Sequence, residues 1–162
     1  VAALSQAHTL RIRPPHSKCM SCFYGDRMEK LAPIKEDNLF EAIDAIQKNP
    51  DIPVTLIRGT CMICPPCSRY DPKTTLCLGG RSMALRDQKK DLDVLQKLGL
   101  KYGDTLPARK LYELLYERVP STRDICGWGD GKERAPEWSI CGDPEGREAY
   151  RNARAAKLGL KS

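Results

Sequence analysis

The chain has 162 residues, a length that fits one domain rather than two. Its hydrophobic fraction of 41 % includes eight cysteines and only two phenylalanines, and glycine and proline contribute twelve residues each. We therefore expect a lean apolar core with many loops. The net charge of +6 is weak evidence for a nucleic-acid partner, because metal-bound thiolates would offset part of it. No apolar run approaches the roughly 20 residues that cross a bilayer, so no membrane span is expected.

The first residues, Val1 to Ser5, have neither the charged nor the apolar segment of a secretory signal. We therefore expect a cytoplasmic protein, in which clustered cysteines more often bind a metal than form disulfides. A mature secreted protein that has lost its signal would look the same, and disulfides would then be expected instead.

The N-terminal segment predicts a strand followed by a loop. Leu10–Arg13 has the composition of a short strand, and the two prolines at 14–15 are expected to stop it. The loop that follows is expected to hold His16, Cys19 and Cys22.

A helix and a second strand come next. Asn38–Lys48 has the apolar spacing of a helix, which Asn49 and Pro50 are expected to end. Apolar residues then alternate from Ile52 to Leu56, as they do in a strand. This order permits a parallel pair of strands joined through a crossover helix.

The middle of the chain predicts an irregular segment and a long helix. Gly59–Gly80 is expected to be a cysteine-rich loop, because its prolines exclude a helix. Arg81–Leu98 is the longest predicted helix. Its expected buried side consists of Leu85, Leu92, Leu95 and Leu98. Its opposite side is expected to face solvent and consists of Asp87, Lys89, Lys90 and Asp91.

Two further helices are predicted near the C-terminus. The first runs from about Pro107 to Val119, with Thr105 as its N-cap. Its inward residues are expected to be Leu111, Leu114 and Leu115. An irregular region, Pro120–Cys141, separates it from the second helix, which begins at Asp143-Pro144 and which Gly159 is placed to close.

These elements predict the α+β class: a short β-α-β unit plus three further segments of which most are helices, with cysteine-rich loops stapled by metal. We divide the chain into a frayed N-terminus at 1–9, a cysteine-rich metal-binding domain at 10–142 and a C-terminal helical extension at 143–162.

The cysteine spacing carries the strongest functional signal. The eight thiols are Cys19, Cys22, Cys61, Cys64, Cys67, Cys77, Cys126 and Cys141. The run from Cys61 to Cys67 offers three sulfurs at two-residue intervals, as ferredoxin-type [4Fe–4S] loops do, with a fourth ligand from elsewhere. A single zinc ion more usually takes two pairs that are further apart. We therefore expect one or two [4Fe–4S] clusters, with zinc as the alternative.

Spacing alone does not assign the thiols to centres. One option joins Cys61, Cys64, Cys67 and Cys77 in one centre and the remaining four in another. The other option is a single centre that draws on all three cysteine regions and leaves spare thiols. His16, three residues before Cys19, is a metal ligand, a hydrogen-bond donor to a cluster sulfur or a structural loop residue.

Several segments follow one another in an order that resembles a known family. They are Leu10–Cys19, Ile63–Cys67 with Cys77 beyond it, Leu92–Asp104, Ile125–Gly127 and Glu137–Cys141. Together they resemble a small cysteine-rich prokaryotic family, a domain of unknown function often labelled iron–sulfur binding, which opens with an Arg-Pro-His-His-x-x-Cys type motif.

The resemblance spans roughly residues 10–141. It implies that the shared thiols are Cys19, Cys64, Cys67, Cys77, Cys126 and Cys141, and that His16 matches the second motif histidine. Pro15 stands where the family has its first motif histidine. Cys22 and Cys61 are additional to the family pattern, which would allow an extra centre.

The leading hypothesis is an iron–sulfur protein of electron transfer. It would serve as a small carrier, or as a subunit or activator of a larger anaerobic redox complex, with a redox protein or that enzyme complex as its partner. The chain contains no phosphate-binding loop, nucleophile elbow or zinc-protease motif, so independent catalysis is not expected.

Two other functions remain open. The alternative is a zinc-stabilised binding module for protein or nucleic acid, motivated by arginines at 147, 151 and 154 along the last helix. Nucleic acid is not favoured, because a solvated helix face explains that stripe and few aromatic residues are available for stacking. The third function is thiol–disulfide exchange at Cys19 and Cys22, although no predicted helix begins at this pair, as redox motifs require.

Overall fold

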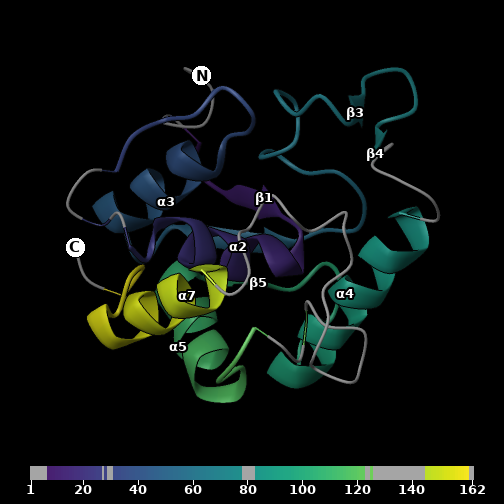
Figure 1. The fold of residues 1–162 in the computed structure, drawn as a ribbon. Helices are drawn as coiled ribbons and strands as arrows, with labels where there is room; N and C mark the ends of the chain where they lie inside the picture. Colours follow the sequence, from purple (N-terminus) through teal and green to yellow (C-terminus); the bar gives the residue numbers. More distant parts are fainter. Residues whose placement is uncertain are drawn as a thin grey trace.

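The structure is a computed structural model that describes residues 7–26, 28, 31–77, 83–122, 125 and 145–160. Within these residues five helices and two small sheets form an α+β fold, which confirms the predicted class (Figure 1). Cys126 and Cys141, the predicted opening of the last helix at 143–144 and residues 1–6 of the predicted frayed terminus lie outside the described residues.

The larger sheet confirms the predicted β-α-β unit. Strand β1 (Leu10–Ile12) pairs in parallel with β2 (Pro53–Leu56), and helix α3 (Leu39–Lys48) lies in the connection between them. Strand β5 (Thr105–Pro107) pairs antiparallel with β2, which gives the order β1-β2-β5. Alternate residues of β1 and β2 are fully buried, so one face of this sheet packs into the core.

The loop predicted around His16 is wrong, because these residues form helix α2 (Pro14–Tyr24). The two prolines occupy the first two helical positions, directly after Arg13 as the N-cap. Proline is favoured there because the first turn needs no backbone N–H partner and the fixed φ angle suits a helix. Pro14 and Pro15 therefore begin a helix as well as ending the strand, and His16 lies in the first turn.

One face of α2 carries small residues that let other helices approach closely. Ser17 and Ser21 are fully buried, and a Cβ atom added at Gly25 would lie 1.7 Å from the carbonyl oxygen of Ala149. Ala149 belongs to helix α7 (Glu145–Ala156), which packs against α2. The absence of a side chain at Gly25 is thus a condition for the contact between these two helices.

Three buried tyrosines fill the space between α2, α7 and helix α5 (Ala108–Arg118). Tyr112 donates a hydrogen bond to the Ser17 carbonyl (3.2 Å), and Tyr150 donates one to the Val119 carbonyl (2.7 Å). Tyr116 donates to the Leu158 carbonyl (2.9 Å). We call Tyr112, Tyr116 and Tyr150 the tyrosine cluster. Each ring is buried with its hydroxyl satisfied, as a buried tyrosine requires.

The N-cap predicted for α5 is wrong. Thr105 lies in β5, where its hydroxyl oxygen is 2.7 Å from that of Thr55 on β2, and Pro107 is the N-cap. At the other end of the chain, the N–H of Leu158 bonds to the Ala153 carbonyl (2.9 Å) beyond α7. Lys157, at φ 57°, is the first left-handed residue there, and Gly159 follows at φ 84°.

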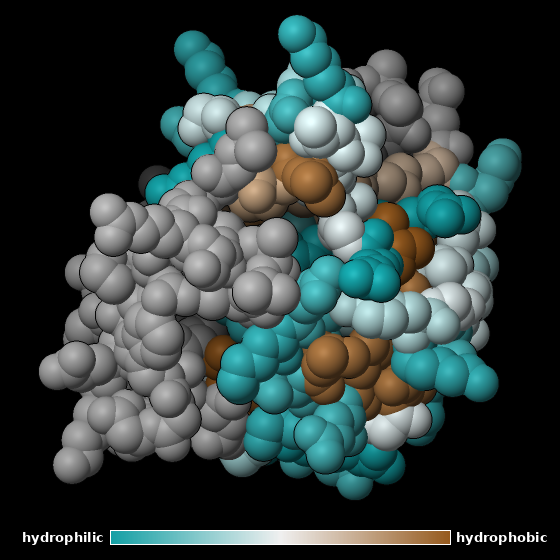
Figure 2. Space-filling model, turned by 90° about the vertical axis from the view of Figure 1, so that its right-hand side faces the viewer, coloured by the Kyte–Doolittle hydropathy of each residue, from teal (hydrophilic) through white to brown (hydrophobic). Residues whose placement is uncertain are grey.

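Helix α4 (Met83–Leu98) buries part of the side that was expected to face solvent. Lys90 and Asp91 are only 6 % and 1 % exposed, whereas Leu92, predicted to be inward, is 56 % exposed. Leu95 and Leu98 are buried as predicted. Figure 2, which shows the side of the molecule that carries α4, has apolar patches among hydrophilic residues.

A long-range ion pair explains the orientation of α4. Arg13 donates two hydrogen bonds to one carboxylate oxygen of Asp91 (2.8 and 3.1 Å), and Tyr102 donates one to the other oxygen (2.8 Å). Arg13 and Asp91 are both buried and 78 residues apart in sequence. A buried charge needs such a partner, so Asp91 turns toward Arg13 and away from water.

The cysteine-rich segment contains no helix over residues 59–77, as predicted. It does form a small hairpin that was not predicted, with β3 (Tyr70–Asp71) paired antiparallel with β4 (Leu76–Cys77). Figure 1 shows this hairpin at the opposite end of the molecule from α5 and α7.

Candidate metal centre

The parallel pairing of β1 and β2 brings the ligand-bearing segments together. Helix α2 follows β1, and the chain that leads to Cys61 follows β2. Neighbouring parallel strands end at the same edge of a sheet, so the residues after them meet in space. The Ile57 N–H, directly after β2, bonds to the Ile12 carbonyl at the end of β1 (2.9 Å).

The residues 61–64, which we call the cysteine turn, lie along the open edge of β1. The Met62 N–H donates to the Arg11 carbonyl (3.3 Å), and the Arg11 N–H donates to the Met62 sulfur (3.1 Å). Within the described part of the chain β1 is an edge strand, so no further strand pairs with Arg11 on this side. The cysteine turn therefore provides hydrogen-bond partners for the edge strand β1, and the same contacts position its two thiols next to that strand.

The start of α3 fixes the cysteine turn from the other direction. The Asn38 backbone N–H donates to the Ile63 carbonyl (3.0 Å), and its side-chain amide donates to the Met62 carbonyl (3.0 Å). Within the turn, the Cys64 N–H donates to the Cys61 carbonyl (3.0 Å). Ile63 is 2 % exposed and anchors the turn in the core. Contacts with β1 and with the start of α3 thus hold the backbone of both cysteines.

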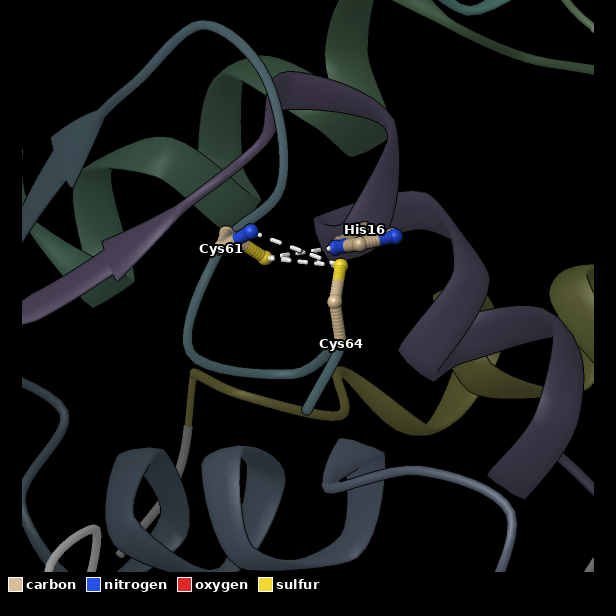
Figure 3. A group of neighbouring side chains, drawn as sticks. All are labelled: His16, Cys61 and Cys64. Atoms are coloured by element: carbon tan, nitrogen blue, oxygen red, sulfur yellow. Dashed lines mark hydrogen bonds between the residues drawn. The ribbon is translucent and has the colours of Figure 1, made fainter. Parts of the chain in front are cut away.

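Three donor atoms converge at this point (Figure 3). The Nδ1 atom of His16 lies 2.9 Å from the Cys61 sulfur, across 45 residues of sequence, and the sulfurs of Cys61 and Cys64 are 4.0 Å apart. All three atoms lie within 4.8 Å of one another. Thiolate sulfur and neutral imidazole nitrogen are the donor set that zinc and related transition metals prefer. These residues therefore form a possible metal-binding site.

The electrostatics of the site differ between the two cysteines. Burial raises the pKa of Cys61, but the Cys64 thiol, the amides of Ile63 and Arg13 and the Arg13 charge outweigh it, so the pKa is lowered overall. The pKa of Cys64 is raised, first by its hydrogen bond to Cys61 and then by burial. Of the two thiols, Cys61 therefore loses its proton more readily than Cys64.

Four other predicted ligands, which the structure describes, lie outside this three-atom group. Cys19 and Cys22 are on α2, with Cys22 buried in the core. Cys67 follows the turn, and its N–H donates to the Cys64 carbonyl (2.8 Å), while Cys77 lies in β4. The group combines Cys61 and Cys64, which one predicted option placed in the same centre, with His16, which was predicted as a possible ligand. Nothing is described of Cys126 and Cys141.

Sequence reasoning missed the residues that hold the site together. Asn38 was predicted only as the start of a helix, and Arg13 and Asp91 as parts of a strand and of a solvated face. The predicted parallel pair of strands could have indicated that His16 lies near Cys61, because each residue follows one of the two strands at a short distance. The Cys19–Cys22 pair lies in the second half of α2 rather than at the start of a helix.

No family model, curated protein or solved structure matches the chain. The resemblance to an iron–sulfur-labelled family therefore stays an expectation from its residues. None of the helices within the described residues has the length and apolar character needed to cross a membrane. The fold and the His16–Cys61–Cys64 group are accordingly the observations on which a functional proposal rests.

Proposed function

We propose that the chain binds one zinc ion through His16, Cys61 and Cys64, and that this ion stabilises a non-catalytic binding module. The observation that carries the proposal is the convergence of three metal-type donor atoms within 4.8 Å, from segments far apart in sequence. The ion would tie α2 to the cysteine turn.

The separation of the sulfurs favours a single ion over a cluster. Two thiolates on one tetrahedral zinc, each about 2.3 Å from the metal, stand about 3.8 Å apart. The 4.0 Å between the sulfurs of Cys61 and Cys64 is close to this value. In a [4Fe–4S] cluster each cysteine binds a different iron, so its sulfurs must stand further apart than two ligands of one ion. The cysteine turn would have to open to hold a cluster.

A fourth donor would complete the tetrahedral shell that structural zinc sites have. Cys67 is a candidate because it follows Cys64 on the next turn of the chain and is partly exposed. The thiols at 126 and 141 are candidates by composition alone. Single serine substitutions at these three positions, compared in zinc affinity, identify the fourth donor.

Metal analysis of the protein purified without oxygen tests the proposal. We expect about one zinc per chain, no inorganic sulfide and no visible absorption band. The variants Cys61→Ser and Cys64→Ser should lose this zinc, whereas Lys48→Ala, at an exposed position on α3, should retain it. Zinc that is absent from the wild-type chain, or unaffected by both cysteine variants, would refute the assignment.

An iron–sulfur carrier for electron transfer is the second candidate. It is favoured by the three cysteines at two-residue intervals and by Cys67 and Cys77, which are both partly exposed on the same segment. Its partner would be a redox protein or a larger enzyme complex. The same analysis decides between the candidates, since about four irons and four sulfides per chain with absorption near 400 nm would replace the zinc proposal.

A further inference from the structure

The two thiols of the cysteine turn lie close enough together for a reaction other than metal binding. The sulfurs of Cys61 and Cys64 lie 4.0 Å apart, and neither is bonded to another cysteine. We propose that Cys61 and Cys64 form a reversible disulfide under oxidising conditions and thereby release the metal. The disulfide follows from the geometry of the thiols, whereas the release of metal rests on the proposed function.

Closing the bond requires the two sulfurs to move toward each other. A disulfide needs the two sulfurs at about 2.05 Å, so the present separation must shrink by roughly 2 Å. Rotation about the Cα–Cβ bonds of two residues three apart in one turn supplies such a shift. The backbone of the turn is held by Arg11 and Asn38 through hydrogen bonds that involve neither sulfur. The fold therefore does not need to open for the bond to form.

Access to oxidants differs between the two thiols. Cys61 is 7 % exposed, whereas Cys64 is only partly buried. A small disulfide such as glutathione disulfide therefore approaches the pair on the Cys64 side. One of the two cysteine sulfurs, as a thiolate, displaces one glutathione thiolate and forms a mixed disulfide, which the other cysteine sulfur then attacks to displace the second.

The reaction balances without any further reagent. Two protein thiols and one glutathione disulfide give one protein disulfide and two glutathione thiols, so two electrons pass from the protein to glutathione. When zinc is bound, the two thiolate ligands are consumed in the same way and Zn²⁺ leaves with the two glutathione thiolates. Only His16 and the fourth donor then remain, two ligands fewer than the four of a structural zinc site, so zinc is no longer retained.

The experiment uses the full chain, treated anaerobically with glutathione disulfide, alkylated with iodoacetamide and digested with trypsin. Cleavage after Arg58 and Arg69 places Cys61, Cys64 and Cys67 on one peptide. We expect the number of alkylated thiols on this peptide to fall from three to one, and dithiothreitol to restore three. The chelating dye 4-(2-pyridylazo)resorcinol should detect one zinc released for each disulfide formed.

Two serine variants identify the partners, because Cys67 is a possible alternative to Cys61. In Cys67→Ser the number of alkylated thiols should fall from two to zero, as the pair remains. In Cys61→Ser it should stay at two. The reverse result would assign the disulfide to Cys64 and Cys67 and overturn the proposal. A peptide that stops at the mixed disulfide with glutathione would overturn it too.

The metal-free protein separates this proposal from the proposed function. If the chain never binds zinc but still forms the disulfide after treatment with a chelator, only the proposed function fails. If one zinc is bound per chain and iodoacetamide still alkylates all three thiols after treatment with glutathione disulfide, the disulfide proposal fails and the metal site stands. Circular dichroism should change by little in either state, since the backbone anchors of the turn persist.

Discussion

The cysteine turn and the tyrosine cluster are held in place by different means. The tyrosine cluster consists of large buried rings whose hydroxyls bond to main-chain carbonyls. In the cysteine turn, hydrogen bonds between the backbone of the turn and Arg11 and Asn38 do much of the positioning, together with the buried side chain of Ile63. The cluster gains its stability from burial, whereas the turn keeps its thiols available for chemistry.

Helix α2 serves both regions with different faces. Ser17, Ser21 and Gly25, at four-residue intervals, face α5 and α7, while His16 points to the cysteine turn. The position of His16 therefore depends on how firmly the opposite face of the same helix is packed. Substitutions that loosen that packing should shift His16 and so weaken the proposed metal site. Substitutions in the cysteine turn should leave the packing of α2 against α5 and α7 intact.

The largest effect is expected from the ion pair that joins α2 to α4. Asp91→Asn removes the charge that compensates the buried Arg13, so the free energy of unfolding should fall by about 3–5 kcal/mol. Urea unfolding measures this loss. Asp93→Asn, which breaks a more exposed pair with Lys89 on the same helix, should cost less than about 1 kcal/mol. Equal losses in both variants would contradict a special role of the buried pair.

The next largest effect concerns the contact between α2 and α7. In Gly25→Ala the new methyl group would overlap the Ala149 carbonyl, so α7 must shift, at a cost of about 2–3 kcal/mol. Urea unfolding again gives the loss. Glu148→Ala, at the neighbouring exposed position, should change stability by less than about 0.5 kcal/mol. A stable Gly25→Ala protein would mean that the close approach is not required.

Alkaline pH should weaken the tyrosine cluster. Burial raises the pKa values of Tyr112, Tyr116 and Tyr150 above the ordinary value of 10.0. Their contribution is fully present below pH 10 and is lost as the pH rises toward the folded-state values. Each tyrosine should cost about 1.4 kcal/mol per pH unit in that range. Unfolding at stepwise higher pH tests this, and Tyr150→Phe should reduce the slope by the share of one tyrosine.

The smallest effect on global stability is expected from removal of the metal. A chelator should accelerate amide hydrogen exchange about tenfold or more in residues 61–67 while α5 and α7 keep their protection. Hydrogen exchange with mass spectrometry resolves the two regions. In Cys64→Ser the chelator should have no effect on the turn. Loss of protection throughout α5 and α7 would show that the ion supports the whole fold.

Local patterns were sufficient to predict the elements whose neighbours are close in sequence. The β-α-β unit follows from alternation at 52–56 and from helical spacing at 38–48. The prolines at 14–15 were misread because the same residue type ends strands and begins helices. Whether a proline begins a helix depends on what the following side chains pack against. Helix α2 packs against α7, which lies more than a hundred residues later in the chain.

Long-range partners decided the remaining features. Asp91 belongs to a run of charges that is typical of a solvated face. Its burial is made favourable by Arg13, 78 residues away, and by the hydrogen bond from Tyr102. The cysteine spacing predicted a metal site but not its membership, since His16 and Cys61 meet across 45 residues. Such pairings depend on strand register, which spacing between cysteines does not encode.

The register of β1 and β2 determines whether the donor atoms of the proposed metal site meet. Leu10 pairs with Val54 and Ile12 with Leu56, and a slip by two residues would keep the same side chains on the buried face. Burial by itself discriminates poorly against that error. The slip would, however, move His16 by roughly 6.6 Å relative to Cys61, at about 3.3 Å per residue, and separate the donors. An ion bound at the site would therefore favour the native register of β1 and β2 over other registers that bury the same side chains.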